Sequence, residues 1–419
     1  MIANRNSAFA ALRHRDFRLL WLGQIVSVTG SQMQLVAINW HVYLLTKSPL
    51  ALGLVGLFRG LPVILCSLAG GVVADAVDRK RLMIVTQTVM LVSAGLLTAT
   101  TLGDLKSVWP IYLLSALGSA ATAFDIPARQ SLLPTLVPLE DFPNAVSLGM
   151  IVFNVATIAG PAIAGALLAE SGPGLIYGIN AVSFLAVIGA LLAMSASGSP
   201  DLRNARKDAL SLAALKEGLT FVWRTPIMVQ TMTLDFVATF FASATLLLPI
   251  FARERLHVDA HGYGWLAAAP AIGSVITAFM MARLGTFQRQ GRLVVWSVAV
   301  FGVATAAFGV SRAFWFSLLM LAITGAADTV STVLRQTIRQ LVTPNYLRGR
   351  MTSINMMFFM GGPQLGELEA GLLAALIGAP LSVVVGGLGS TAAAGITAVK
   401  SKSLMEFEIS DVQTEITVR

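Results

Sequence analysis

Five ionisable residues lie inside long apolar stretches of this sequence, and their types limit the chemistry they can do. They are Arg59, Asp235, Asp328, Glu367 and Glu369. A charge in the hydrocarbon of a bilayer costs several kcal/mol, so such residues are functional candidates by default. Carboxylates and an arginine in these surroundings can pair with one another, or take up and release protons. We therefore predict proton coupling or gating, rather than covalent catalysis.

Asp235 is the first choice for the coupling acid. It lies near the middle of its apolar run, and the polar side chains of Thr231, Thr239 and Ser243 flank it. A carboxylate at this depth, with no obvious partner in its own helix, is typical of a proton carrier. The alternative is a neutral, hydrogen-bonded acid that holds helices together.

Helical geometry places the other carboxylates. Asp328 lies about two helical turns from Arg335, which we expect on the cytoplasmic side, so a structural ion pair is predicted between them. Glu367 and Glu369 are two positions apart, about 200° around a helix, and cannot share a face. At most one of them is expected to meet Arg59, and the sequence does not decide which.

A short charged segment, residues 70–81, separates two of the apolar runs and reads GGVVADAVDRKR. A glycine turn followed by acid and then base, between two hydrophobic helices, is hard to explain in a water-soluble protein. It favours a loop at a membrane surface. The alternative interpretation of Asp75 is an ordinary loop carboxylate.

The composition indicates the elements that must position these residues. Hydrophobic residues make up 56% of the 419 residues and charged residues 12%, whereas water-soluble proteins carry about 25% charged residues. A spanning helix needs roughly 20 apolar residues. We count twelve such runs, at residues 17–45, 49–74, 82–103, 109–128, 144–170, 175–197, 226–251, 261–284, 293–311, 314–334, 351–377 and 380–398. The prediction is an all-α membrane protein with twelve transmembrane helices.

Charge distribution predicts the orientation of these helices. Most of the 29 Lys and Arg residues fall in one set of alternate loops, so the positive-inside rule places both termini in the cytoplasm. We expect a six-helix half at 1–197, a cytoplasmic linker with an amphipathic helix at 198–225, a second half at 226–400 and a cytoplasmic tail at 401–419. A plain linker is the alternative. The first apolar run is too long for a signal peptide.

The sequence lacks the motifs that would indicate other classes of protein. One cysteine, Cys66, cannot form an intrachain disulfide, and no His/Cys cluster predicts a metal or cofactor. Hydrolase, zinc-protease and phosphate-loop motifs are missing, so an enzyme is not expected. The net charge of +8 comes from clusters between apolar runs, which membrane topology explains better than nucleic acid. A membrane scaffold would need no carboxylates at the midplane.

An internal repeat relates the two halves. A shift of 206 positions superimposes identical residues over 129–165 without gaps. The superimposed pairs are Arg129 and Arg335, Gln130 and Gln336, Pro138 and Pro344, Ser147 and Ser353, Met150 and Met356, Phe153 and Phe359, Gly160 and Gly366, and Gly165 and Gly371. Two parallel six-helix halves around an axis normal to the membrane are one transporter architecture.

Several segments together resemble one family. They are FRLLWLGQ at 17–24, FDIPARQSLLP at 124–134, LKEGLTFV at 215–222 and LRGRM at 347–351, besides the segment at 70–81. They are similar to the branch of the major facilitator superfamily that contains enterobactin exporters and macrolide efflux proteins. The resemblance covers nearly the whole chain and is specific for the fold, but not for the substrate.

The resemblance implies a conformational latch formed by Gly71, Asp75, Asp78, Arg79 and Lys80. In the family, the residue at the position of Asp75 caps the start of span 11, where the helix dipole and free N–H groups favour an anion. Asp78 and Arg79 would form the surrounding charge network. The corresponding loop of the second half lacks the acidic residue.

Further features follow from the resemblance. Gly160, Pro161 and Gly165 are similar to the Gly-Pro signature of drug/proton antiporters, the alternative being a packing kink. The arginine that family antiporters carry in the middle of span 4 is missing from residues 111–118. Spans 2 and 11 face each other in the family. Arg59 is therefore expected to meet a glutamate of span 11 as a gate, or as a static bridge.

The family resemblance implies a cavity lined by spans 1, 4, 7 and 10. The candidate lining residues on span 1 are Gln24, Gln32, Gln34, Asn39, Trp40 and His41. We expect a monomeric, proton-coupled exporter of amphipathic, largely uncharged small molecules such as drugs or siderophores, working by alternating access in a bacterial inner membrane. Its partners would be the small-molecule substrate, the proton gradient and the lipid bilayer. Proton-coupled import of a metabolite is the alternative, and the coupling ion is left open.

Overall fold

The computed structural model describes residues 9–104, 106–196, 220–285, 287–344 and 348–407. For residues 68, 72, 75, 244 and 348–361 it describes the backbone alone. Throughout the described ranges the chain is helical and contains no β-strand, which confirms the predicted all-α class. Most of the predicted linker at 198–225, and the tail beyond residue 407, lie outside the described residues.

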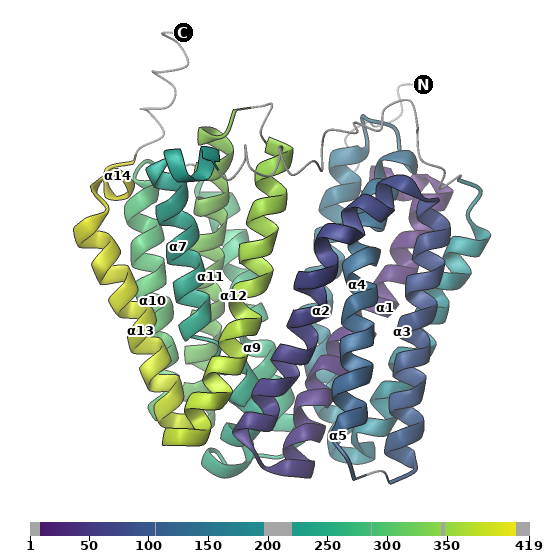
Figure 1. Ribbon diagram of the computed structural model, residues 1–419, viewed down its shortest axis with the longest axis horizontal. Coiled ribbons are helices and arrows are strands. Elements are labelled where there is room, and N and C mark those ends of the chain that lie inside the picture. The colour runs from purple at the N-terminus through teal and green to yellow at the C-terminus, as the bar shows by residue number, and fades with distance from the viewer. Residues whose placement is uncertain (1–8, 105, 197–219, 286, 345–347, 408–419) are drawn as a thin grey trace. The chain divides into compact units, whose positions relative to one another are not determined.

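The long helices follow the predicted apolar runs (Figure 1). The first half of the chain forms α1 (Arg15–Thr46), α2 (Pro49–Ala76), α3 (Arg79–Leu102), α4 (Trp109–Leu132) and α5 (Phe142–Ala193). The second half forms α7 (Pro226–Phe241), α9 (Ala260–Leu284), α10 (Gln290–Val310), α11 (Phe314–Val342), α12 (Arg348–Ile377) and α13 (Ala379–Lys400). Short helical turns are η1 (Ala10–Arg13), η2 (Leu133–Thr135), η3 (Ala244–Leu247), α8 (Leu248–Ile250), η4 (Phe251–Arg255) and α14 (Lys402–Met405).

Nine helical segments within the described residues are long and apolar enough to cross a membrane. One of them, α5, has 52 residues, which is more than twice the length that one crossing requires. Gly172 interrupts it with φ 71° and ψ −176°, a conformation that glycine adopts without steric cost. Gly172 therefore separates the two apolar runs predicted at 144–170 and 175–197.

Large apolar side chains cover the outside of the helices. Trp296, Trp315 and Val399 are each at least two-thirds exposed, and so are Leu65 and Leu376. A water-soluble surface rarely carries so much contiguous apolar area. Together with the nine candidate spans, this surface is that of a multi-pass membrane protein.

The described helices group into two compact units. The first unit comprises Met1–Lys47, Phe58–Ala205 and Asp259–Ala268. The second comprises Ser48–Leu57, Arg206–Val258 and Ala269–Arg419. The first turns of α2 thus belong to the second unit, and those of α9 belong to the first. A division of the chain at its linker does not predict this exchange.

Small residues bring the helices of each unit close together. In the first unit, α1 packs on α5 where a Cβ on Gly23 would lie 3.1 Å from the carbonyl oxygen of Ala186. In the second unit, α10 packs on α13, where a Cβ on Gly309 would lie 2.8 Å from Cγ2 of Val384. Figure 1 shows α7, α10 and α13 side by side. Close backbone approach is the usual source of helix affinity in lipid, where the hydrophobic effect is missing.

Two glycine pairs occupy corresponding positions of the repeat. In the first unit, a Cβ on Gly165 of α5 would lie 2.6 Å from Cα of Gly264 in α9. In the second unit, a Cβ on Gly371 of α12 would lie 2.6 Å from Cα of Gly53 in α2. The α5 and α12 members are separated by 206 positions, and the α2 and α9 members by 211. The sequence repeat is therefore also a repeat of helix contacts.

Candidate functional site

A buried ion pair joins α7 to α11 in the second unit. Nη2 of Arg335 lies 2.7 Å from Oδ1 of Asp235, and the two side chains are 3% and 9% exposed. The sequence pairs Arg335 with Asp328, and the two residues interact electrostatically, but α11 continues beyond the predicted end at 334 to Val342. Arg335 is consequently a residue of the helix itself, and its short contact is with the neighbouring helix.

Asp328 belongs to the same polar cluster, on the same face of α11. Its carboxylate accepts a hydrogen bond from Thr332 and interacts electrostatically with both Arg335 and Asp235. Thr332 in turn accepts a hydrogen bond from Nη2 of Arg335 at 3.1 Å. Arg339, one turn further on and half-buried, interacts electrostatically with Arg335 and Asp235. Two carboxylates and one fully buried arginine therefore form a single network.

The first unit holds a half-buried arginine, Arg129, whose partner is the buried neutral side chain of Gln24. Nη1 of Arg129 in α4 donates a short hydrogen bond to Oε1 of Gln24 in α1. Asp125, four residues earlier in α4, accepts hydrogen bonds from the hydroxyl of Thr86 at 2.9 Å and from the amide of Gln87 at 3.0 Å. Asp125 is 4% exposed. Asp125 was not among the candidate site residues predicted from the sequence, and Arg129 was named there only as part of the internal repeat.

The two networks are related by the repeat. Arg129 and Arg335 are separated by 206 positions, and Gln24 and Asp235 by 211. These are the same two offsets that relate the glycine pairs. An arginine–amide contact in the first unit therefore corresponds to an arginine–carboxylate contact in the second. The repeated Arg-Gln dipeptide is the sequence signal that could have identified both arginines.

The glutamines of the predicted cavity lie where α1 meets α5. Asn180 donates to Oε1 of Gln34 at 2.7 Å, and a Cβ on Gly160 would lie 2.6 Å from Cβ of Gln32. Pro161, the next residue of the antiporter-like segment, has its carbonyl oxygen at the α5–α9 contact. Both glutamines are partly exposed. Gly160 and Pro161 thus lie at helix crossings.

The remaining candidates on α1 are buried within the first unit. The ring of Trp40 stacks on Tyr263 with centroids 5.0 Å apart. Nδ1 of His41 lies 3.2 Å from the hydroxyl of Tyr177, and Asn39 is 9% exposed. Aromatic packing accounts for Trp40 and His41 in this conformation. Their role as lining residues of a substrate cavity stays a prediction.

The predicted latch segment forms the junction of α2 and α3. Asp78 caps α3, since its carboxylate accepts a hydrogen bond from the N–H of Arg81 at 2.9 Å. Lys80 donates to the carbonyl oxygen of Met194, just after α5, at 2.7 Å. Gly71 has open space where a Cβ would be, and Arg79 is partly buried. The side chain of Asp75 lies outside the described part of the chain.

The expected gate residues lie on α2 and α12. Glu367 packs against the first turns of α2, where a Cβ on Gly56 would lie 2.5 Å from Cβ of Glu367. Glu369 and Arg59 are both half-buried. Glu367 therefore contacts α2. Its pairing with Arg59 stays a prediction.

The helix that carries Asp235 breaks shortly afterwards. α7 ends at Phe241, whereas the predicted run continued to residue 251. The hydroxyl of Ser390 donates to the carbonyl oxygen of Ala238 at 2.9 Å, and the hydroxyl oxygen of Ser243 lies 3.1 Å from the carbonyl oxygen of Pro363. Ala238 also accepts a hydrogen bond from the N–H of Ala242 at 3.2 Å, so the Ser390 hydroxyl is a second donor to this carbonyl close to the break. Discontinuous helices recur at the binding sites of transporters.

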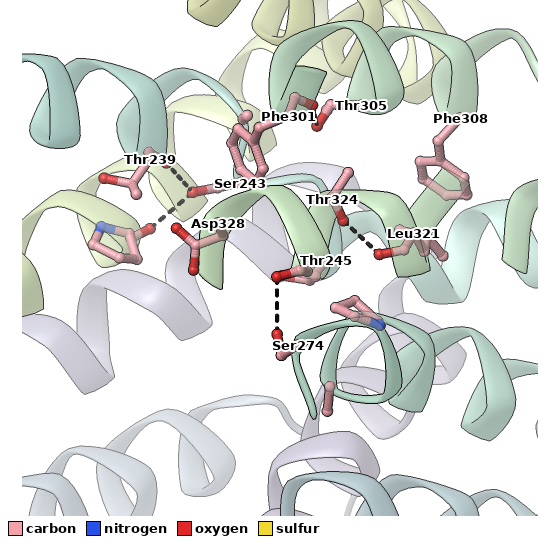
Figure 2. Close-up of a pocket in the computed structure, with 15 residues that line it drawn as sticks. Thr239, Ser243, Thr245, Ser274, Phe301, Thr305, Phe308, Leu321, Thr324 and Asp328 are labelled. Atoms are coloured by element: carbon pink, nitrogen blue, oxygen red, sulfur yellow. Dashed lines mark hydrogen bonds between the residues drawn. The ribbon is translucent and has the colours of Figure 1, made fainter. Parts of the chain in front are cut away.

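A cavity of about 240 Å³ opens beside this break, inside the second unit (Figure 2). Its walls come from the end of α7 and from α9, α10, α11 and α12. Asp328 is the one ionisable side chain among its described lining residues, and it points toward the hydroxyl-rich wall that includes Ser243 (Figure 2). The charge network of α7 and α11 is thus continuous with a cavity.

Comparison with known proteins gives the family. The family model MFS_3, described as a transmembrane secretion effector, matches residues 6–416. The chain belongs to the major facilitator superfamily. It is therefore a transporter and not an enzyme, as the sequence predicts.

Two curated relatives of this facilitator are exporters. It is 25% identical to the enterobactin exporter EntS of Shigella boydii over 90% of this chain and 89% of the relative. It is 26% identical to the multidrug efflux pump Tap of Mycolicibacterium fortuitum over 85% of this chain and 88% of the relative. The predicted branch of the superfamily is confirmed.

Solved structures agree on the fold of the facilitator. A mutant of the nucleoside transporter NupG superimposes with a TM-score of 0.72 at 13% identity, covering 92% of this chain and 100% of that one. A POT family transporter in complex with 5-aminolevulinic acid gives 0.74 at 11% identity, covering 94% and 97%. At these identities the likeness establishes the fold alone.

Proposed function

We propose that this facilitator is a proton-driven exporter of amphipathic small molecules that works by alternating access. Both curated relatives described above are exporters, and each matches this chain over most of its length. Counting α5 as two spans and adding α1 and α12 to the candidate segments gives the twelve spans of the proposal. Both termini would then be cytoplasmic in a bacterial inner membrane.

The observation that carries proton coupling is the buried Asp235–Arg335 pair. Removing one charge of such a pair leaves the other uncompensated in a low dielectric, which is strongly unfavourable. Nε of Arg335 is buried and has no hydrogen-bond partner among the described residues. When a proton neutralises Asp235, Arg335 has this spare donor and a second carboxylate, Asp328, in its network. The network can therefore hold one proton and still keep one ion pair.

The first experiment measures export in cells. The chain is expressed in an efflux-deficient bacterium, and the accumulation of macrolides, dyes and catecholate siderophores is followed with and without an uncoupler. Depletion of a compound that the uncoupler abolishes supports proton-driven export. Accumulation that depends on the proton gradient would instead indicate an importer. Depletion that depends on Na⁺ but not on the proton gradient would identify Na⁺ as the coupling ion.

The second experiment tests Asp235 as the coupling acid. In proteoliposomes with an imposed pH gradient, Asp235→Asn is expected to abolish uphill transport of a substrate found in cells while it retains downhill exchange. The matched control is Asp104→Asn, because Asp104 is 86% exposed in the loop after α3 and its φ of 54° also suits asparagine. Uphill transport at the wild-type rate in Asp235→Asn would show that Asp235 is not the coupling acid.

A further inference from the structure

The cavity of the second unit has a lining that accepts hydrogen bonds but has few donors to offer. The hydroxyls of Thr239 and Ser243 donate to the carbonyl oxygens of Asp235 and Thr239 at 2.8 Å. Those of Ser274, Thr305 and Thr324 donate to backbone carbonyls of α10 and α11. The protons of these five hydroxyls are thus used within the protein, and the oxygen lone pairs remain available. Such a wall suits a ligand that donates hydrogen bonds.

The charge of the lining also favours a ligand that donates hydrogen bonds. Asp328 is partly exposed on the wall, and no lysine, arginine or histidine is among the described lining residues. The short contact of Arg335 is with Asp235, outside the lining. Arg339 lies further along α11 and also interacts with Asp235. The cavity therefore presents a carboxylate that shares Arg335 with a second acid, Asp235, and Asp235 makes the short contact with that arginine.

The size and the apolar part of the cavity limit the ligand further. Phe301 and Phe308 of α10 and Leu321 of α11 line one side. A volume of about 240 Å³ is below the roughly 300–1,000 Å³ that encloses a drug-sized ligand. It is much larger than a bare metal cation requires. The cavity is therefore matched to one end of a larger molecule, with both a polar and an apolar wall.

We propose that this cavity binds the protonated amine end of an amphipathic substrate, with Asp328 as its counter-ion. The proposal deepens the proposed export function and rests on it for the identification of the ligand as a substrate. It departs from the largely uncharged ligand that the sequence indicates. The ammonium would donate to Asp328 and to hydroxyl oxygens such as that of Thr324, while its first carbons contact Phe301.

The test compares two probes that differ in charge and by one acetyl group. Dansylcadaverine carries a primary ammonium, and its N-acetyl derivative replaces that group by a neutral amide. Fluorescence titration of each probe is done on the full-length transporter in nanodiscs. Because a charge-assisted hydrogen bond is worth about 1.5–3 kcal/mol, the wild type is expected to bind the amine at least about tenfold more tightly than the amide.

Variants assign that preference to the cavity. Asp328→Asn is expected to give the two probes equal affinity, and Asp328→Glu to retain the preference. Asp104→Asn is the matched surface control. If Asp328→Asn does not fold, Ala271→Leu, which fills the cavity and leaves every charge in place, is expected to weaken both probes. Equal affinities in the wild type, or an undiminished preference in Asp328→Asn, would overturn the proposal.

Two further readouts separate the possible outcomes. Replacement of Na⁺ by choline should leave amine binding unchanged, and displacement of the amine by Na⁺ would assign the cavity to the inorganic ion instead. Uncoupler-sensitive export of neutral compounds, with no amine preference, would retain the export function and reject this subsite. Amine binding that requires Asp328, without uphill transport of any compound, would retain the subsite and reject proton-driven export.

Discussion

Arg129 and Arg335 have partners of different charge, although the repeat relates their positions. Arg335 contacts the carboxylate of Asp235, whereas Arg129 contacts the amide of Gln24. An amide cannot be neutralised by a proton, so its contact does not respond to pH. We therefore expect the proton-sensitive contact in the second unit alone. The first unit therefore has a neutral contact, Arg129 with Gln24, at the position where the second unit has the ion pair of Arg335 with Asp235.

The ion pair makes a prediction for stability. Arg335→Met should lower the free energy of unfolding by about 3–5 kcal/mol, because it leaves Asp235 buried without its partner. The double variant Asp235→Leu/Arg335→Met should recover most of this loss, since replacing both charges by apolar groups is often neutral. Thermal unfolding of the purified variants in detergent measures both. Additive losses in the double variant would show that the two residues are not coupled.

The neutral contact makes the corresponding prediction in the first unit. Gln24→Leu removes the acceptor of the half-buried Arg129 and should cost about 0.5–1.5 kcal/mol, the net contribution of a typical hydrogen bond. Gln24→Glu keeps an acceptor and adds an opposite charge, so it should unfold at or above the wild-type temperature. The same thermal measurement applies. Equal losses in the two variants would mean that the hydrogen bond to Arg129 contributes nothing and that packing alone matters at this position.

At the scale of whole helices, two crossings depend on glycine at the point of contact. The α5–α9 and α2–α12 contacts leave no space for a Cβ, whereas Gly149 and Gly189 of α5 and Gly71 of α2 face open space. Crossings of this kind use van der Waals contact between backbones, which is the main attraction available between helices in lipid. Small residues at these crossings are therefore required by the approach distance rather than by helix propensity.

This requirement can be tested within one helix. Gly165→Ala should force α5 and α9 apart and cost about 1–3 kcal/mol, as overpacking does, with a matching loss of transport. Gly189→Ala is the control in the same helix α5, because nothing lies within 4 Å of its Cβ position. Thermal unfolding and substrate efflux are measured together. A Gly165→Ala protein with wild-type unfolding temperature and wild-type efflux would show that this crossing is loosely packed in the membrane.

The charge bias of the loops predicts the orientation of the whole molecule in the membrane, and labelling tests this prediction. The chain has one cysteine, Cys66, so a Cys66→Ser background has no thiol. Lys106→Cys, between α3 and α4, should react with a membrane-impermeant maleimide added to intact cells. Lys402→Cys, after α13, should react only after permeabilisation. The reverse pattern would place the termini outside.

Local patterns in the sequence were sufficient to predict the helical architecture. Apolar runs predict helices wherever they occur, because each span must bury its own backbone hydrogen bonds and cover them with apolar side chains. The runs near Arg15–Thr46 and Ala379–Lys400 match helix bounds to within a few residues. The family followed from short motifs, and the Arg-Gln repeat already indicated where the two halves correspond.

Contacts between helices distant in the chain were decided by tertiary structure alone. Hydropathy placed Arg335 in a loop because an arginine interrupts an apolar run, yet the carboxylate of Asp235 on α7 makes its burial favourable. The end of α7 depends in the same way on a distant helix, since the hydroxyl of Ser390 on α13 donates to it. The sequence by itself determined the helices, the repeat and the family. The partner of each buried charge, and the cavity beside Asp328, depend on which faces of those helices meet, because the energy of a buried charge is set by its neighbours in space.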